Sequence, residues 1–281
     1  MAEATKGNMK VLINDLGAIM CCNYYQVWVS ETADPNHEPF GFGSGFMILH
    51  KGHMYYITAD HVVNAANDKF KLNPEKDYDA NLLTNEIVTE NHIQKAEQVQ
   101  FGINKADGIF AVKIQNNGVI IQDERIDVYF KPLDEHIHTP FYTQGVKFSE
   151  TDIRYGQLRK MMIIEESIDR NICPEHTFAI YGVINSSVMK GFQVEGSSIF
   201  HQGMTFKESK YNQYCLEASR NDEHLLMEEW AGLSGAAVYD EMTNKVIGMA
   251  VQYSDAYNYC WVLPIGLIFD FIDNDIRERY Q

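Results

Sequence analysis

The sequence has no long apolar run, and this absence argues against a membrane-spanning protein. No stretch approaches the roughly 18 consecutive apolar residues of a spanning helix. The segment MAEATKGNMK at the start is polar where a secretory signal peptide needs apolar residues. We therefore expect no leader, no membrane partner and a cytoplasmic location.

Cysteine is scarce, with five residues in a chain of 281, and the spacing contains no CxxC pair. An odd number of cysteines without paired spacing does not predict a disulfide framework, and a reducing compartment is the expected setting. Two short clusters of metal-ligand residue types occur, and neither has a partner pair at fitting spacing. They are Asp134, Glu135, His136 and His138, and the pair Cys173 and His176. We expect no metal and no cofactor.

Positive charge is also in short supply, since 23 Lys and Arg face 39 Asp and Glu and the net charge is −16. No clustered basic run interrupts this balance. A field of this sign repels the phosphate backbone, which argues against a nucleic-acid partner. Basic peptides or proteins are the more natural partners.

The residues that are present indicate an all-β fold. Apolar and aromatic runs of four to eight residues recur between Gly, Asn, Asp and Pro, which favours a sandwich or barrel over βαβ units. We expect strands at 24–29, 45–49, 54–58, 99–103, 109–114, 126–130, 158–165, 177–183, 236–239, 246–253 and 259–263. His50 to His53 form a hairpin turn by the same reasoning. Behind Pro264 the apolar spacing becomes helical, which predicts a final amphipathic helix packed on the last strand.

The sharpest chemical motif is Gly232-Leu233-Ser234-Gly235. A serine in a glycine-flanked turn exposes its hydroxyl, and the backbone N–H groups of Gly232 and Ser234 can hold the oxyanion of a tetrahedral intermediate. Taken alone, the same four residues are more often an ordinary β-turn.

A serine nucleophile needs a base, and His61 is the histidine placed to serve as one. It follows the expected strand Tyr-Tyr-Ile-Thr-Ala-Asp directly, at the lip of that strand. An incidental histidine at a helix start is the alternative. Asp107, immediately ahead of Gly-Ile-Phe-Ala-Val, is the candidate acid that orients the imidazole, and a turn residue is its alternative interpretation.

Together these motifs resemble a chymotrypsin-fold serine protease. The order His…Asp…Ser carries the resemblance, and the Phe-Gly-Ser-Gly-Phe-Met-Ile segment at 42–48 is similar to the HtrA-like branch, although we expect no PDZ-like module. The resemblance implies two antiparallel six-stranded β-barrels and a C-terminal α-helix, with the first barrel in 1–125 and a linker, the second barrel and the helix in 126–281. It implies His61 as base, Asp107 as orienting acid and Ser234 as nucleophile.

The sequence supports two different interpretations of the specificity pocket. The resemblance places Glu228 at the pocket floor, which favours a basic residue at the cleaved position, whereas Glu228 is also compatible with a solvated loop. It also places Val251, Gln252 and Tyr253 along the substrate backbone, where the ring of Tyr253 narrows the pocket. These two indications disagree.

The resulting prediction is a serine endopeptidase that forms an acyl-enzyme, with a catalytically silent protease-fold binding protein as the alternative. An α/β-hydrolase is less compatible, because Ser234 comes last in the chain order and Ala236 replaces the final glycine of that motif. Region 126–225 has no motif in common with the chymotrypsin-fold family, and we expect a regulatory partner to bind there.

Overall fold

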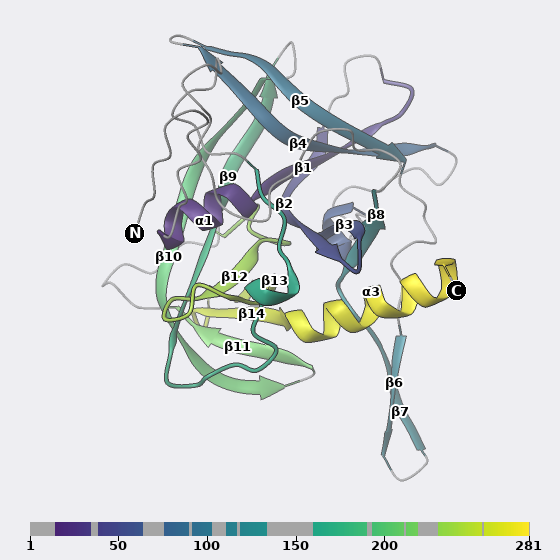
Figure 1. The fold of residues 1–281 in the computed structure, drawn as a ribbon, viewed down its shortest axis with the longest axis vertical. Coiled ribbons are helices and arrows are strands. Elements are labelled where there is room, and N and C mark those ends of the chain that lie inside the picture. The colour runs from purple at the N-terminus through teal and green to yellow at the C-terminus, as the bar shows by residue number, and fades with distance from the viewer. Residues whose placement is uncertain are drawn as a thin grey trace.

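The computed structural model describes residues 15–34, 39–63, 76–89, 92–102, 111–116, 119–133, 160–189, 193–210, 212–218, 230–254 and 256–280. Figure 1 shows two β-sheets, one above the other, with the last helix extending from the lower sheet below the upper one and a hairpin that projects away from both. The elements are α1 (Leu16–Asn23), β1 (Tyr25–Glu31), β2 (Pro39–His50), β3 (His53–Thr58), α2 (Asp60–Val63), β4 (Tyr78–Thr89), β5 (His92–Gly102), β6 (Ala111–Asn116), β7 (Val119–Arg125), β8 (Tyr129–Pro132), the 3-10 helix η1 (Glu165–Ser167), β9 (Thr177–Met189), β10 (Gln193–Lys210), β11 (Gln213–Glu217), β12 (Ala237–Asp240), β13 (Val246–Ser254), β14 (Tyr259–Pro264) and α3 (Ile265–Tyr280).

The first sheet has six strands in the order β5-β4-β1-β2-β3-β8, and its neighbouring strands pair antiparallel. The sheet continues past residue 125, because Tyr129 to Pro132 of β8 pair with β3. The division of the chain at 125 and 126 therefore has to move beyond Pro132. The hairpin of β6 and β7 forms a separate two-stranded sheet.

The second sheet is a closed six-stranded barrel in the order β10-β11-β14-β13-β12-β9. Its interior is apolar, as expected where alternating strand positions face one core. The prediction of two six-stranded antiparallel sheets followed by a helix is thus confirmed. Among the described strands, the second sheet closes into a barrel, whereas the first sheet stays open between β5 and β8.

Two local predictions are confirmed. Lys51 and Gly52 have positive φ values of 51° and 85°, as a tight hairpin turn between β2 and β3 requires. The final helix α3 begins directly after Pro264 and contacts both β13 and β14. Its predicted apolar face is buried, with Ile265, Ile268, Phe269, Ile272 and Ile276 in the core that it shares with the first sheet.

One predicted strand does not form as such. Within 158–165, the described residues form isolated bridges at Met161 and Ile163, the latter to Ile48, and then enter η1. Four observed strands, β4, β7, β10 and β11, were not predicted. The described residues contain no helix long and apolar enough to cross a bilayer.

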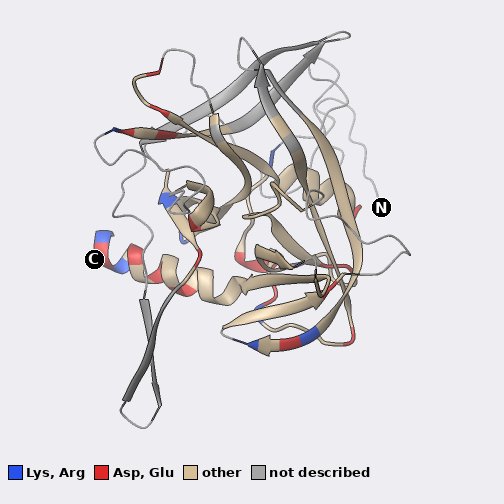
Figure 2. Cartoon of the chain, turned by 180° about the vertical axis from the view of Figure 1, so that it is seen from behind, with Lys and Arg blue, Asp and Glu red and all other residues tan. Residues whose placement is uncertain are grey.

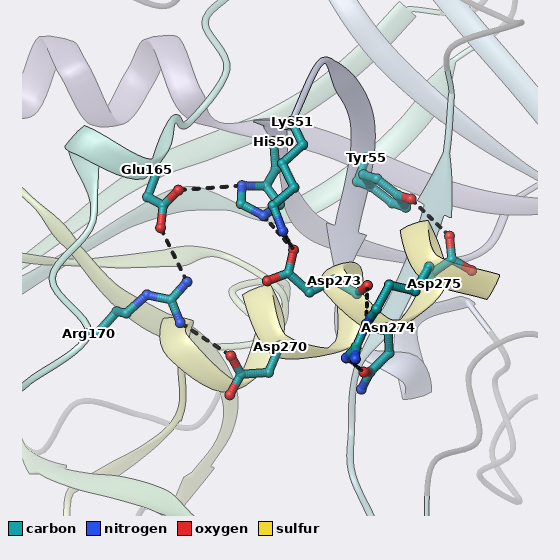
Figure 3. Close-up of polar contacts among 10 residues, drawn as sticks. His50, Lys51, Tyr55, Glu165, Arg170, Asp270, Asp273, Asn274 and Asp275 are labelled. Carbon is teal, nitrogen blue, oxygen red and sulfur yellow. Dashed lines mark hydrogen bonds and ion pairs between the residues drawn. The ribbon is translucent and has the colours of Figure 1, made fainter. Parts of the chain in front are cut away.

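Polar contacts fix α3 against the turn of β2 and β3 (Figure 3). His50 is 3% exposed, and its Nε2 lies 2.7 Å from the Asp273 carboxylate, which also accepts from Lys51 Nζ at 2.6 Å. Tyr55 donates to Asp275 at 2.9 Å, and Arg170 bridges Glu165 and Asp270 (Figure 3). The helix carries several acidic residues, with basic ones near its C-terminal end (Figure 2). The helix that leaves the second barrel is therefore attached to the first sheet.

Candidate active site

His61 lies at the start of the short helix α2, three residues after the end of strand β3, and an aspartate contacts its ring. Its Nδ1 lies 2.6 Å from Oδ2 of Asp127, and its backbone N–H donates to Oδ1 of the same carboxylate at 3.0 Å. The ring and the main chain of His61 are thus held by one side chain. With Nδ1 as the donor, a neutral imidazole presents the Nε2 lone pair as its acceptor. The side chains of His61 and Asp127 are 32% and 30% exposed, so both are partly accessible to solvent.

Asp127 was not among the residues predicted from the sequence. It lies two residues before β8, whose pairing with β3 brings the start of β8 beside the end of β3 and hence near His61. Asp107, which was predicted for this role, lies outside the described residues. In the described structure, the partner of the imidazole is Asp127.

Ser44 of β2 connects this strand end to the turn that carries Ser234. Its N–H donates to the carbonyl of Ser234 at 3.0 Å, and its hydroxyl donates to the carbonyl of Gly232 at 2.5 Å. The carbonyl of Ser44 in turn accepts from Thr58 Oγ1 at 2.6 Å. Since Thr58 is the last residue of β3 and precedes His61 by three positions, the serine turn docks on the part of the first sheet that holds His61.

The two glycines of the motif are required by this docking. Gly235 has a φ of +91°, and a Cβ there would lie 2.0 Å from the carbonyl oxygen of Ser44 and 2.4 Å from Thr58 Oγ1. Gly232 has a φ of +106°, and a Cβ there would lie 2.9 Å from the carbonyl oxygen of Val183 in β9. Only glycine tolerates both the φ values and the close backbone approach.

The N–H groups of the turn divide into two sets. Those of Leu233 and Gly235 donate to the carbonyls of Trp230 and Ala250, at 3.1 and 2.8 Å. Those of Gly232 and Ser234 have no acceptor among the residues that the structure describes. These two are the N–H groups that the sequence analysis predicted as oxyanion donors.

The predicted substrate-binding residues belong to β13, next to this turn. Val251 is buried, Gln252 is exposed, and Tyr253 is partly buried with its ring stacked on Trp230 at 4.2 Å between centroids. Ala250 joins the strand to the turn, since its N–H donates to Ala236 at 2.9 Å. Glu228, the predicted pocket floor, lies outside the described residues.

The cysteines do not supply a competing nucleophile. Burial raises the pKa of Cys22 and of Cys260 to about 12 and that of Cys215 to about 11. Burial also raises the pKa of Cys21, and a hydrogen bond to Glu175 raises the pKa of the Cys173 thiol. All five are therefore thiols rather than reactive thiolates near neutral pH.

In the predicted pair of metal-ligand residues, Cys173 and His176, each side chain contacts a carboxylate. His176 Nδ1 pairs with the buried Asp240 carboxylate at 2.6 Å, while Cys173 donates to Glu175 at 3.2 Å. Over the described ranges, no group of three or more His, Cys, Asp or Glu side chains could hold an ion. The cluster at 134–138 lies outside those ranges.

No protein-family model and no curated protein matches the chain. Among solved structures it is similar to the serine endoprotease from Yersinia pestis, at 13% identity and a TM-score of 0.43 over 95% of this chain and 68% of that chain. It is similar to human heparin binding protein at 11% identity and a TM-score of 0.47, over 94% of each chain. It is also similar to the tobacco vein mottling virus protease, at 9% identity and a TM-score of 0.39 over 92% of this chain and 83% of that chain.

Similarities at this level do not establish catalytic activity, and they do not single out an HtrA-like branch. The strand order of the chain itself carries the structural conclusion. A curled six-stranded sheet, a closed six-stranded barrel and a C-terminal helix make this a chymotrypsin-like two-barrel fold.

Proposed function

We propose that the chain is a serine endopeptidase in which Ser234 is the nucleophile, His61 the general base and then acid, and Asp127 the orienting acid. The main support is the contact between His61 and Asp127, because it fixes the ring so that Nε2 accepts a proton.

The reaction would proceed by acyl transfer. Ser234 Oγ attacks the scissile carbonyl and its proton passes to His61 Nε2, while Asp127 stabilises the imidazolium. The N–H groups of Gly232 and Ser234 donate to the carbonyl oxygen as it becomes an oxyanion. The imidazolium returns its proton to the leaving amine, and water then hydrolyses the acyl-enzyme by the same steps.

Intact mass after treatment with a fluorophosphonate probe tests this proposal. We expect one adduct, located on Ser234 by peptide mapping and abolished by Ser234→Ala and by His61→Ala. Ser209→Ala is the matched control, because this serine is exposed on β10 and is not part of the glycine turn. Absence of an adduct on the folded wild-type protein, in buffer and in host lysate, would contradict the proposal and favour a silent binding protein.

A further inference from the structure

Ser44 lies between two glycines of β2, and the three residues divide between the two faces of the strand. A Cβ at Gly43 would lie 2.4 Å from a Val62 methyl group, and one at Gly45 would lie 2.2 Å from the Tyr56 hydroxyl. Because neighbouring positions of a strand point to opposite faces, both glycines face the core of the first sheet and the Ser44 side chain points away from it. That side chain is fully buried and contacts the serine turn, residues 232–235, of the second barrel.

Two peptide units of the serine turn have their carbonyl group held by Ser44. In the unit that joins Gly232 to Leu233, the carbonyl accepts from the Ser44 hydroxyl at 2.5 Å. In the unit that joins Ser234 to Gly235, the carbonyl accepts from the Ser44 N–H at 3.0 Å. One residue of the first sheet therefore holds both units.

The N–H groups of the same two units are held within the second barrel. That of Leu233 donates to the carbonyl of Trp230 at 3.1 Å, and that of Gly235 donates to the carbonyl of Ala250 at 2.8 Å. Each unit is thus fixed at both ends, by one bond from each side of the contact between the barrels. The unit that lies between them carries the N–H of Ser234, so its orientation follows from these four bonds.

The Ser44 hydroxyl is enclosed where it meets the turn. A Cβ at Gly182 of β9 would lie 3.2 Å from Ser44 Oγ and 2.4 Å from Leu233 Cδ2. Replacing Ser44 by alanine removes one oxygen atom, which leaves too little space for a water molecule to take its place. The Gly232 carbonyl then lacks its donor, and the wide conformational freedom of glycine allows this peptide unit to rotate towards another one.

We propose that Ser44 is a positioning residue for acyl transfer, because its hydroxyl holds the serine turn with the N–H groups of Gly232 and Ser234 directed at the oxyanion. This inference rests on the proposed peptidase function and adds to it a residue that takes no part in the proton transfer between Ser234 and His61. The donor belongs to the first sheet and the acceptor to the second barrel. The oxyanion geometry therefore depends on the contact between them.

The rate of fluorophosphonate labelling of Ser234, measured across a range of pH, tests this proposal. Ser44→Ala should lower the plateau of the pH profile at least about tenfold, because displaced donors stabilise the developing charge less. The midpoint of the profile should stay that of the wild type, because the general base His61 and its partner Asp127 are unchanged. Ser44→Cys, which keeps a weaker S–H donor, serves if Ser44→Ala does not fold and should slow labelling in the same way.

Ser30→Ala is the matched control, since Ser30 is another fully buried serine of the first sheet. It lies in β1, and its hydroxyl oxygen accepts from Asn81 Nδ2 at 2.9 Å. This variant loses a buried hydrogen bond of the same kind, and it should label at the wild-type rate. Labelling of Ser44→Ala within about threefold of the wild type, an equal slowing in Ser30→Ala, or a shifted midpoint in Ser44→Ala would overturn the proposal.

Amide hydrogen exchange separates this proposal from the peptidase proposal. If the wild type does not label, the proposed chemistry fails, and exchange in the turn still reports on Ser44. In Ser44→Ala, the amide of Leu233 should exchange at least about tenfold faster, because its peptide unit has lost one of two bonds. The amide of Gly235 should change less, because the carbonyl of its unit still accepts from the N–H of residue 44. Unchanged exchange at Leu233, or an equal rise at both amides, overturns the proposal.

Discussion

Replacing Asp127 by Asn is the most informative single substitution, because it keeps the shape of the side chain and changes only what it offers to His61. The carboxylate accepts at 2.6 Å from Nδ1 and at 3.0 Å from the backbone N–H of His61. An amide can satisfy the backbone donor with its oxygen, but it then presents an NH₂ group to Nδ1. The ring must switch to the tautomer that carries its proton on Nε2, the nitrogen that has to accept from Ser234.

The size of the effect follows from this tautomer change and from the loss of the charge that stabilises the imidazolium. We expect labelling of Ser234 by a fluorophosphonate to slow by about 10⁴-fold, which is about 5 kcal/mol of activation free energy. The stability change should be small, about 1 kcal/mol or less, because the Asp127 side chain is 30% exposed and its volume does not change. The labelling rate and a urea unfolding curve measure the two quantities separately.

Two controls identify the cause of the loss. Asp107→Asn should leave the labelling rate close to that of the wild type, and Asp127→Glu should restore part of it because a carboxylate is again present. Nitrogen NMR of the His61 ring should show the proton on Nδ1 in the wild type and on Nε2 in Asp127→Asn. An Asp127→Asn protein that labels within tenfold of the wild type, or an Asp107→Asn protein that is slower still, would refute the assigned role.

Two further predictions concern stability. Gly235→Ala should destabilise the protein by more than about 3 kcal/mol and abolish labelling of Ser234, because the added Cβ would lie 2.0 Å from the Ser44 carbonyl oxygen. Gly52→Ala is its control, since Gly52 has a similar φ of +85° but no atom within 4 Å of an added Cβ. It should lower the free energy of unfolding by only about 1 kcal/mol in the same urea unfolding measurement. Asp273→Asn should lower the free energy of unfolding by about 1 to 3 kcal/mol at pH 7 and by less at pH 3. Partial burial opposes ionisation of Asp273, but hydrogen bonds from Lys51 and His50 outweigh it and lower its pKa below 3.8. The stabilisation is therefore complete above the unfolded-state pKa and is lost as the pH falls through the folded-state value, and equal losses at pH 7 and pH 3 would contradict this assignment.

The sequence supports prediction best where one local pattern determines the structure. The final helix is predictable because Pro264 marks its start and a single apolar stripe gives its buried face. The turn at Lys51 and Gly52 is predictable because few residue types adopt positive φ there. Strand β10 lacks such a signal, since Ser197 and Ser198 are exposed and the strand forms through pairing with β9. Its long-range partner, rather than its own composition, determines its structure.

The carboxylate that contacts His61 shows where prediction of the site from the sequence fails. Asp107 and Asp127 both precede an apolar run, and an aspartate ahead of a strand is common to turns and active sites alike. Asp107 is separated from its run by Gly108, whereas Asp127 is followed directly by Val128 and Tyr129, which are fully buried. The absence of an intervening glycine was the available signal for Asp127. Asp127 reaches His61 through the pairing of β8 with β3, which is a long-range contact.

The hairpin of β2 and β3 contacts both the serine turn and the C-terminal helix α3. Near one end, Ser44 and Thr58 hold the turn of Ser234 from the second barrel. At the other end, about 20 Å along the strand, His50 and Lys51 hold α3, the helix that follows that barrel's last strand. The second barrel is thus fastened to the same hairpin at two points. His61 comes three residues after this hairpin, so the strand that leads to His61 is bound by the serine turn near one end and by α3 at the other.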